Sequence, residues 1–185
     1  PGDRHQLREK LGWRQDLPVV VLVGGGEGMG PLAATARAID AAGLALQLVV
    51  IAGRNKGLKE QLERHPWQIP VKIYGFVKEM PDFMRAADVL ITKAGPGTIS
   101  EAFIAGLPLI LYSKMPGQED GNVAYVVNKQ AGVWAPEPEK VVSTLRTWIK
   151  YPQHRLEVAE TSRSLARPEA SRQIARILVE RAGLI

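Results

Sequence analysis

Glycine-rich segments are the part of this sequence best suited to chemistry. Residues 24–31 read GGGEGMGP, and residues 92–101 read TKAGPGTISE. Because glycine has no side chain, backbone N–H groups in such a segment can approach an anion closely, and a helix that starts there adds a partial positive charge. A tight turn is the ordinary alternative, but five glycines within seven residues of the first segment exceed what a turn requires. That segment is therefore predicted to contact a phosphate group or a neighbouring domain.

The second segment adds side chains that can bind the rest of a nucleotide. Gly95, Gly97 and Thr98 are predicted to present N–H groups and a hydroxyl to a diphosphate at the start of a helix. Glu101 lies one helical turn further on, where its carboxylate can accept hydrogen bonds from two vicinal ribose hydroxyls. Thr98 and Glu101 also have the spacing of a capping box, which only closes the end of a helix. Spacing alone leaves both interpretations of Glu101 open.

A third, polar segment at residues 116–122 reads PGQEDGN. Amide and carboxylate side chains form directional hydrogen bonds, so Gln118, Glu119 and Asn122 are suited to recognising sugar hydroxyls. Taken alone, the segment is more typical of an ordinary polar surface loop. Its predicted position in the fold is what makes it a candidate site.

The surrounding elements predict an α/β domain with a doubly wound parallel sheet. Apolar runs without polar alternation are typical of strands buried on both faces, and they occur at residues 19–23, 46–51, 71–74, 89–92 and 107–111. Helical patterns alternate with these runs, at residues 31–42, 58–64, 80–87 and 98–105. This alternation predicts right-handed crossovers, a Rossmann-like sheet and helices on both of its faces.

All three polar segments follow predicted strands, so they are expected to share one edge of the sheet. Ligands of doubly wound sheets bind at this edge, where the carboxyl ends of the strands lie. Two shorter segments, after the second and third strands, reach the same edge. Arg54 and Lys56 are predicted to meet phosphate charge there, and Phe76 to flank a base. Solvated charge and loop packing remain the alternatives for these three residues.

The rest of the chain is predicted to complete one domain. Residues 1–17 are either a linker or an N-terminal helix, and residues 18–185 form the Rossmann-like domain. Later elements are expected as helices at residues 122–130, 137–150 and 169–182 and as a short strand at residues 133–134. The last helix carries Ile174, Ile177 and Leu178 on one face, and this apolar stripe predicts docking on the sheet.

Several functional classes are disfavoured by the sequence. A dinucleotide fingerprint needs a third glycine where Pro31 stands, and it needs an acidic residue at the end of the second strand, which here ends in AGR. His5, His65 and His154 lack any metal-ligand spacing, so no metal is expected. The chain has no cysteine, and its net charge of +5 comes from scattered basic residues. This charge suits a nucleotide diphosphate or an acidic lipid surface better than a nucleic acid.

Six segments carry a resemblance to a known family: GGGEGMGP (24–31), AGRNK (52–56), GFV (75–77), TKAGPGTISE (92–101), GLPLI (106–110) and GQEDGN (117–122). In this order they resemble the C-terminal domain of the monogalactosyldiacylglycerol synthases, which belong to glycosyltransferase family 28. The resemblance extends from about Leu17 to the end of the chain. It implies one half of a GT-B fold, in which two Rossmann-like domains face a cleft. It also implies inverting transfer of galactose from UDP-galactose to diacylglycerol.

The resemblance further implies which residues contact the UDP-hexose. The implied contacts are Gly25, Gly26, Glu27, Arg54, Gly75, Phe76, Val77, Thr92, Gly95, Gly97, Thr98, Glu101, Gln118, Glu119 and Asn122. Residues 75–77 would border the uracil, Glu101 would hold the ribose hydroxyls, and Gly97 with Thr98 would hold the diphosphate.

At the sugar end, the resemblance implies that Gln118 and Glu119 recognise the hexose and that residues 25–27 line the cleft near the sugar and the acceptor. In this family the N-terminal domain carries acceptor binding and the catalytic base, so no catalytic residue is assigned here and the chain alone is expected to be inactive. The diacylglycerol acceptor implies peripheral contact with a membrane, expected on its cytoplasmic side. No cofactor, metal or nucleic acid partner is expected.

Two alternatives stay open at this point. One is a UDP-glucose-dependent diacylglycerol glucosyltransferase. The other is a non-catalytic UDP-sugar-binding subunit that works with a partner chain. The sequence begins at Pro1 without an initiator Met, which favours a domain of a longer protein over a separate subunit.

Overall fold

Within residues 3–26 and 30–182, which the computed structural model describes, parallel strands form one six-stranded sheet. The strands are β1 (Val19–Val23), β2 (Gln47–Ile51), β3 (Val71–Tyr74), β4 (Val89–Lys93), β5 (Leu109–Ser113) and β6 (Gly132–Trp134). Their order across the sheet is β3-β2-β1-β4-β5-β6, and every neighbouring pair is parallel. The direction of winding changes between β1 and β4, so this order confirms the predicted doubly wound, Rossmann-like sheet.

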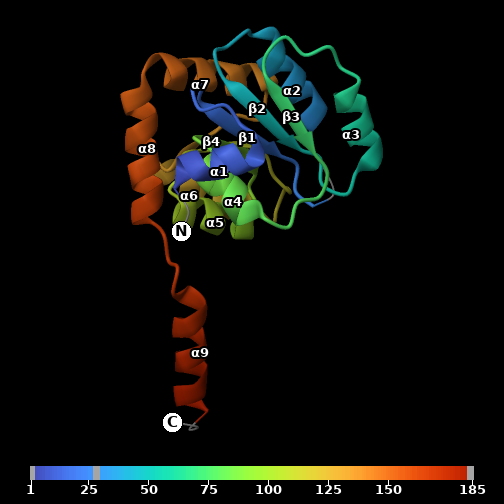
Figure 1. Cartoon of the computed structure of the whole chain (residues 1–185). Coiled ribbons are helices and arrows are strands. Elements are labelled where there is room, and N and C mark those ends of the chain that lie inside the picture. Colours follow the sequence, from blue (N-terminus) through green and yellow to red (C-terminus); the bar gives the residue numbers. More distant parts are fainter. Residues whose placement is uncertain (1–2, 27–29, 183–185) are drawn as a thin grey trace.

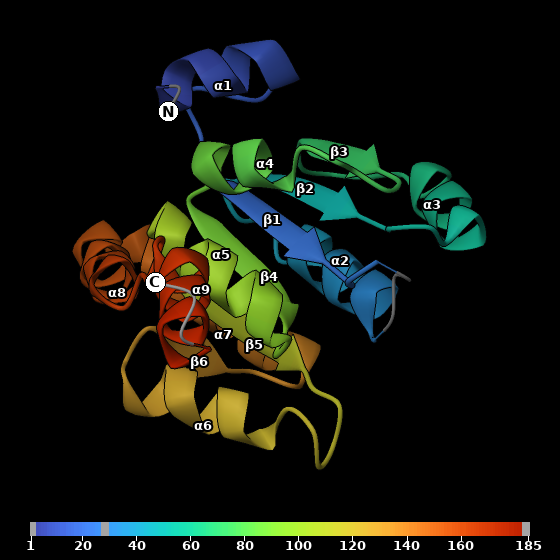
Figure 2. The same ribbon diagram turned by 90° about the horizontal axis from the view of Figure 1, so that it is seen from below.

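Helices cover both faces of the sheet (Figures 1 and 2). One face packs against α4 (Met80–Ala86), α5 (Pro96–Ala105) and α6 (Asp120–Asn128). The other face packs against α2 (Leu32–Ala41), α3 (Lys56–Glu63) and α7 (Pro138–Lys150). In Figure 2, α4 and α5 lie in front of the strands and α2 lies behind them. The predicted two-layer covering is therefore confirmed.

The two cores explain why the apolar runs form strands. Every residue of β1 and β2 is buried. Val19 and Val21 pack into the core beneath α4 and α5, whereas Val20 and Leu22 pack into the core beneath α2 and α7. Because alternate residues of a strand point to opposite faces, a strand between two helical layers is apolar at almost every position. The buried Gln47 of β2 is an exception, and its Oε1 accepts a hydrogen bond from the N–H of Arg14 at 2.7 Å.

Most element ends differ from the predicted ends by one or two residues, and β5 shows a physical reason. The predicted strand began at residue 107, but β5 begins at Leu109. Gly106 ends α5 with a left-handed φ of 67°, and the N–H of Leu107 donates to the carbonyl of Ala102 at 2.9 Å. Leu107 therefore completes the end of the helix and does not pair in the sheet.

Residues 4–11 form a helix, α1 (Arg4–Leu11), that packs against α4. Arg8 is buried, and its guanidinium donates to the carbonyl of Ala86 at 2.8 Å and to Asp88 Oδ2 at 2.6 Å. Trp13 Nε1 donates to the hydroxyl of Tyr74 at 3.0 Å. These bonds fix the segment before β1 to the α4 face of the sheet.

The two last helices differ from the sequence prediction. α8 (Pro152–Ser164) occupies a polar stretch with no predicted element, and it packs against α5 and α7. α9 (Ala170–Arg181) extends away from the rest of the chain (Figure 1). Its apolar residues Ile174, Ile177 and Leu178 are 58%, 55% and 63% exposed. The prediction that this stripe docks on the sheet is wrong, because other helices already cover both faces.

Candidate functional site

The loops after β1 and β2 cross at the carboxyl edge of the sheet. The N–H of Arg54 donates to the carbonyl of Gly26 at 2.7 Å. Gly53, with a φ of 63°, lies directly beneath this crossing. A Cβ at Gly53 would overlap the carbonyl of Gly26 and approach the carbonyl oxygen of Gly25 to 2.7 Å. Only glycine fits here, so the chain itself fixes the first glycine segment against the second strand.

Arg54 and Phe76 form a stacked pair beside this crossing. The guanidinium carbon of Arg54 lies 4.4 Å from the centre of the Phe76 ring. Phe76 is 51% exposed, which is high for a large aromatic side chain. Gly75 alone separates it from the end of β3. An exposed ring held by a cation at a sheet edge offers a flat surface on which a base can stack.

The start of α5 provides backbone donors on the same edge. Gly95 is the N-cap, and the first helical hydrogen bond runs from the N–H of Ile99 to the carbonyl of Gly95. Pro96 has no N–H, so Gly97 and Thr98 carry the N–H groups that precede the helical ladder. A Cβ at Gly97 would meet no atom within 4 Å. The turn therefore presents two N–H groups and an open space beside them.

A cavity of about 150 Å³ lies between these loops. Its walls are the ends of β1 and β2, the segment between β3 and α4, and the first turn of α5. The predicted residues that line it are Gly25, Gly26, Phe76, Val77 and Thr98. The structure thus brings together candidate residues that lie up to about seventy positions apart in the sequence.

Glu101 lies in the next groove, between α4 and α5. Its neighbours around this groove of about 240 Å³ include Pro81, Met84 and Arg85. Since α5 begins at Pro96 with no side-chain hydrogen bond at its N-cap, the capping-box interpretation of Glu101 is wrong. The Glu101 carboxylate is exposed and is therefore available to a ligand. It lies on the same helix as Thr98, one turn further on.

Glu119 is buried, in contrast to an ordinary loop residue. Its side chain is 5% exposed, and Oε1 lies 2.7 Å from the Nζ of Lys93. Oε2 accepts a hydrogen bond from the N–H of Met115 at 2.9 Å. Burial raises the pKa of this carboxyl, but the bonds from Lys93 and Met115 outweigh burial and hold the pKa below its ordinary value. Glu119 is therefore an ionised carboxylate inside the loop.

The other predicted residues near the third segment have different surroundings. Gln118 is exposed, whereas Asn122 donates from Nδ2 to the carbonyl of Ala94 at 2.8 Å. Thr92 lies in β4 and is 1% exposed, so its hydroxyl is not accessible to a ligand here. Glu27, also predicted, lies outside the described residues. The structure therefore supports Gln118 as an accessible group and gives Asn122 a role in joining two loops.

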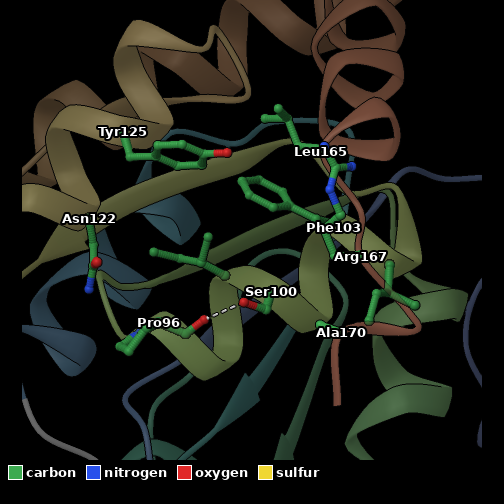
Figure 3. Close-up of a pocket in the computed structure, with 10 residues that line it drawn as sticks. Pro96, Ser100, Phe103, Asn122, Tyr125, Leu165, Arg167 and Ala170 are labelled. Atoms are coloured by element: carbon green, nitrogen blue, oxygen red, sulfur yellow. Dashed lines mark hydrogen bonds between the residues drawn. The ribbon is translucent and has the colours of Figure 1, made fainter. Parts of the chain in front are cut away.

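A larger cavity of about 270 Å³ lies on the other side of α5 (Figure 3). Figure 3 shows Phe103 of α5 and Tyr125 of α6 on its walls, with Leu165 and Arg167 at one end. The two aromatic rings lie 6.4 Å apart between centres. Asn122 and Pro96 line the opposite end, so this cavity borders the start of α5 at the carboxyl edge of the sheet.

Two site residues were not predicted from the sequence. Gly53 carried a signal, because a glycine directly after a buried strand indicates a close backbone approach. Lys93 carried none, because its partner Glu119 lies 26 residues away. Among the described residues, no three or more His, Asp or Glu side chains gather as metal ligands, and no helix is long and apolar enough to cross a bilayer.

The sequence pattern of the glycosyltransferase family 28 C-terminal domain matches residues 19–175. This match spans most of the chain. The chain belongs to glycosyltransferase family 28. It is 45% identical over 173 residues to the chloroplastic monogalactosyldiacylglycerol synthase 1 of Arabidopsis thaliana, covering 89% of this chain and 32% of that protein. The family 28 chain thus spans about a third of the length of the curated relatives it matches.

Solved structures with the same fold agree with family 28 membership. MurG from Acinetobacter baumannii superposes with a TM-score of 0.72 at 22% identity, over 97% of this chain and 54% of that one. The UDP-GlcNAc 2-epimerase from Neisseria meningitidis, solved with UDP-GlcNAc bound, superposes with a TM-score of 0.69 at 16% identity, over 96% of this chain and 49% of that one. The family 28 domain described here is thus one Rossmann-like half of a GT-B-type structure.

Proposed function

We propose that this chain is the donor-binding domain of an inverting galactosyltransferase that moves galactose from UDP-galactose to diacylglycerol. The observation that carries the proposal is the convergence of glycine-lined loops and the start of α5 on one cavity at the carboxyl edge of the sheet. The names of relatives at about 45% identity give the product of those proteins as monogalactosyldiacylglycerol, which supports galactose and diacylglycerol as the two groups that are joined. Because those relatives are about three times longer, the activity of a whole protein is part of the proposal and not an observation.

The donor would lie along the edge with its base near Phe76 and its diphosphate at the start of α5. Phe76 and Val77 offer the ring of a uracil a wall of the cavity. Glu101, an exposed carboxylate on α5, lines a separate groove between α4 and α5, one helical turn along α5 from Thr98. The N–H groups of Gly97 and Thr98 would meet the diphosphate oxygens, and Gln118 would reach the hexose. A solved protein of the same fold carries UDP-GlcNAc, which supports a UDP-sugar as the ligand class.

The mechanism follows from where charge appears during transfer. When the bond between the hexose and the phosphate breaks, the sugar becomes oxocarbenium-like and the leaving UDP gains negative charge. The N–H groups of Gly97 and Thr98 and the partial positive charge at the start of α5 stabilise that charge. One donor of this kind contributes about 3 kcal/mol to transition-state stabilisation in other enzymes. Arg54 and Lys56, on the neighbouring loop, would add positive charge, and no metal is required in this scheme.

The acceptor and the membrane belong to the same proposal. Diacylglycerol resides in a bilayer, so the enzyme would contact a membrane at its surface. The cytoplasmic side of that membrane stays a prediction from the sequence, whereas the plant relatives are named as chloroplastic proteins.

Calorimetry with the 185-residue chain tests the donor site. We expect UDP to bind, UDP-galactose to bind more tightly than UDP, and UDP-glucose to bind more weakly than UDP-galactose. Tighter binding of UDP-glucose would favour the glucosyltransferase alternative, and absence of UDP binding would refute the proposed site.

The ribose role of Glu101 has its own test in the same assay. Glu101→Ala should weaken UDP binding about tenfold, because ribose hydroxyls would lose their acceptor. The same variant should bind 2′,3′-dideoxy-UDP as well as the unchanged chain does, because that analogue lacks both hydroxyls. Glu60→Ala, which removes an exposed carboxylate from α3, is the control for charge. Equal losses for UDP and its 2′,3′-dideoxy analogue would remove Glu101 from the ribose role.

A further inference from the structure

Lys93 and Glu119 join the two loops that would hold the two ends of a sugar diphosphate. Lys93 ends β4, directly before the turn that starts α5, and Glu119 directly follows Gln118. Their side chains meet at 2.7 Å across a sequence separation of 26 residues. The ion pair therefore connects the proposed diphosphate-binding turn with the loop that carries the proposed hexose-binding residue.

The loop before α6 depends on this ion pair because Glu119 is buried. The side chain of Glu119 is 5% exposed, and that of Lys93 is 30% exposed. A buried carboxylate stays ionised only when polar partners replace its hydration, and breaking a buried pair is costly. Of the two hydrogen bonds described above for the Glu119 carboxylate, only the one from the N–H of Met115 would remain without Lys93.

Lys93 also fills the space between the two glycine segments. A Cβ at Gly25 would lie 3.4 Å from its Cε, and a Cβ at Gly95 would lie 3.7 Å from its Nζ. A second hydrogen bond links the same two segments, from Asn122 Nδ2 to the carbonyl of Ala94. Movement of Lys93 would therefore disturb the packing of both glycine segments and of the loop that carries Gln118.

We propose that Lys93 is a positioning residue that holds the loop of residues 114–119, through Glu119, where Gln118 can reach the hexose of a UDP-sugar. The inference rests on the proposed donor site and deepens it. It assigns the preference for a UDP-hexose over UDP to an ion pair beneath the loop, in addition to the groups that touch the sugar.

Affinities for UDP and UDP-galactose, measured by calorimetry on the 185-residue chain, test the proposal. Lys93→Met keeps the length of the stem and removes the charge. It should lower the affinity ratio of UDP-galactose to UDP about tenfold, as expected for one displaced hydrogen-bonding group. Lys93→Arg keeps the charge and should restore the ratio to within about threefold. Lys129→Met removes the same charge from an exposed position at the far end of α6 and should leave the ratio unchanged.

The pH dependence of the affinity for UDP-galactose, measured beside a carbon-13 NMR titration of the Glu119 carboxyl, gives a readout that a purely structural role of Lys93 would not move. In the unchanged chain the pKa of Glu119 is below its ordinary value, so the carboxylate is ionised at every pH above that point. In Lys93→Met, burial is no longer offset by the ammonium, and the pKa should rise. As the pH falls, the affinity of this variant for UDP-galactose should then begin to decline at a higher pH than that of the unchanged chain.

The outcomes separate this inference from the proposed function. If Lys93→Met weakens UDP and UDP-galactose binding equally, Lys93 acts on the diphosphate; the positioning role is then overturned while the donor site stands. If the unchanged chain binds no UDP, the donor site itself fails. Should Lys93→Met not fold, Glu119→Gln removes the charge of the pair from the other side. An unchanged affinity ratio in Glu119→Gln would also overturn the inference.

Discussion

Gly97 is a glycine that the surrounding structure does not require. It is the second residue of α5, its φ is not left-handed, and a Cβ there would meet no atom within 4 Å. Glycine in a helix costs about 0.5–1 kcal/mol relative to alanine. A close approach by a ligand explains why the position nevertheless lacks a side chain, since a Cβ would stand where the proposed diphosphate meets the N–H groups of the turn.

Gly97→Ala should therefore separate stability from binding. We expect the free energy of unfolding in urea to stay constant or to rise by up to about 1 kcal/mol. We expect the affinity for UDP, measured by calorimetry, to fall at least about tenfold because the methyl group displaces the diphosphate.

Gly121→Ala is the matched control for this variant. Gly121 is the second residue of α6, and a Cβ there also meets no atom within 4 Å. Its substitution should leave the affinity for UDP unchanged. If Gly97→Ala bound UDP as tightly as the unchanged chain, the diphosphate would not lie against the start of α5.

At the scale of elements, the crossing of the first two loops sets the shape of the cavity. Gly53 permits the crossing because it has no side chain. A Cβ there would overlap the carbonyls of Gly25 and Gly26, and its φ of 63° is left-handed. The bond from the N–H of Arg54 to the carbonyl of Gly26 then closes the wall between β1 and β2. The site thus depends on backbone packing as well as on groups that face a ligand.

Gly53→Ala should damage both stability and binding. The left-handed φ alone costs about 1–2 kcal/mol for a residue with a Cβ. The overlap with Gly26 adds to this cost, since the first loop must move away. Gly43→Ala, at a φ of 58° with no atom within 4 Å of its Cβ, isolates the cost of the backbone alone. The free energy of unfolding in urea should be lower for Gly53→Ala than for Gly43→Ala. Only Gly53→Ala should weaken UDP binding. Equal stabilities of the two variants would contradict the crossing as a constraint.

The sequence predicted the sheet well because strands buried on both faces have an unmistakable composition. The run at residues 19–23 coincides with the fully buried β1, whereas β3, at the predicted residues 71–74, is only partly buried and exposes Lys72. The shared edge brought Gly25, Phe76 and Thr98 to one cavity as expected. α8 escaped prediction because it has no strong apolar stripe. It is held instead by contacts with its neighbours, such as the bond from Ser162 Oγ to the carbonyl of Ala131.

The inner structure of the site was less predictable for a different reason. Composition and spacing report which groups a loop contains, whereas a pairing such as that of Lys93 with Glu119 depends on how two loops meet. Glu119 was predicted as a group that recognises the hexose, and the structure places it beneath the loop surface. Thr92, grouped with the same segment by the resemblance, is enclosed in β4 for the same reason, since strand position decides its burial.

At the scale of the whole molecule, α9 stands apart from the body that holds the site. An amphipathic pattern indicates that a face prefers burial but does not identify the surface that buries it. None of the residues of α9 is buried here, whereas α7 buries Val141, Leu145 and Trp148. The helix therefore contributes little apolar burial to the stability of the described body.

Removal of α9 should leave the body intact. A chain that ends at Arg167 should melt within about 2 °C of the full chain in calorimetry, since little buried area is lost. It should also bind UDP with unchanged affinity, because α9 lines no part of the cavity beside Phe76. A chain that ends at Tyr151 also loses α8, which packs against α5 and α7, and it should melt at least about 5 °C lower. A comparable loss of melting temperature in the chain that ends at Arg167 would mean that α9 packs on the body in solution, as its apolar stripe had suggested.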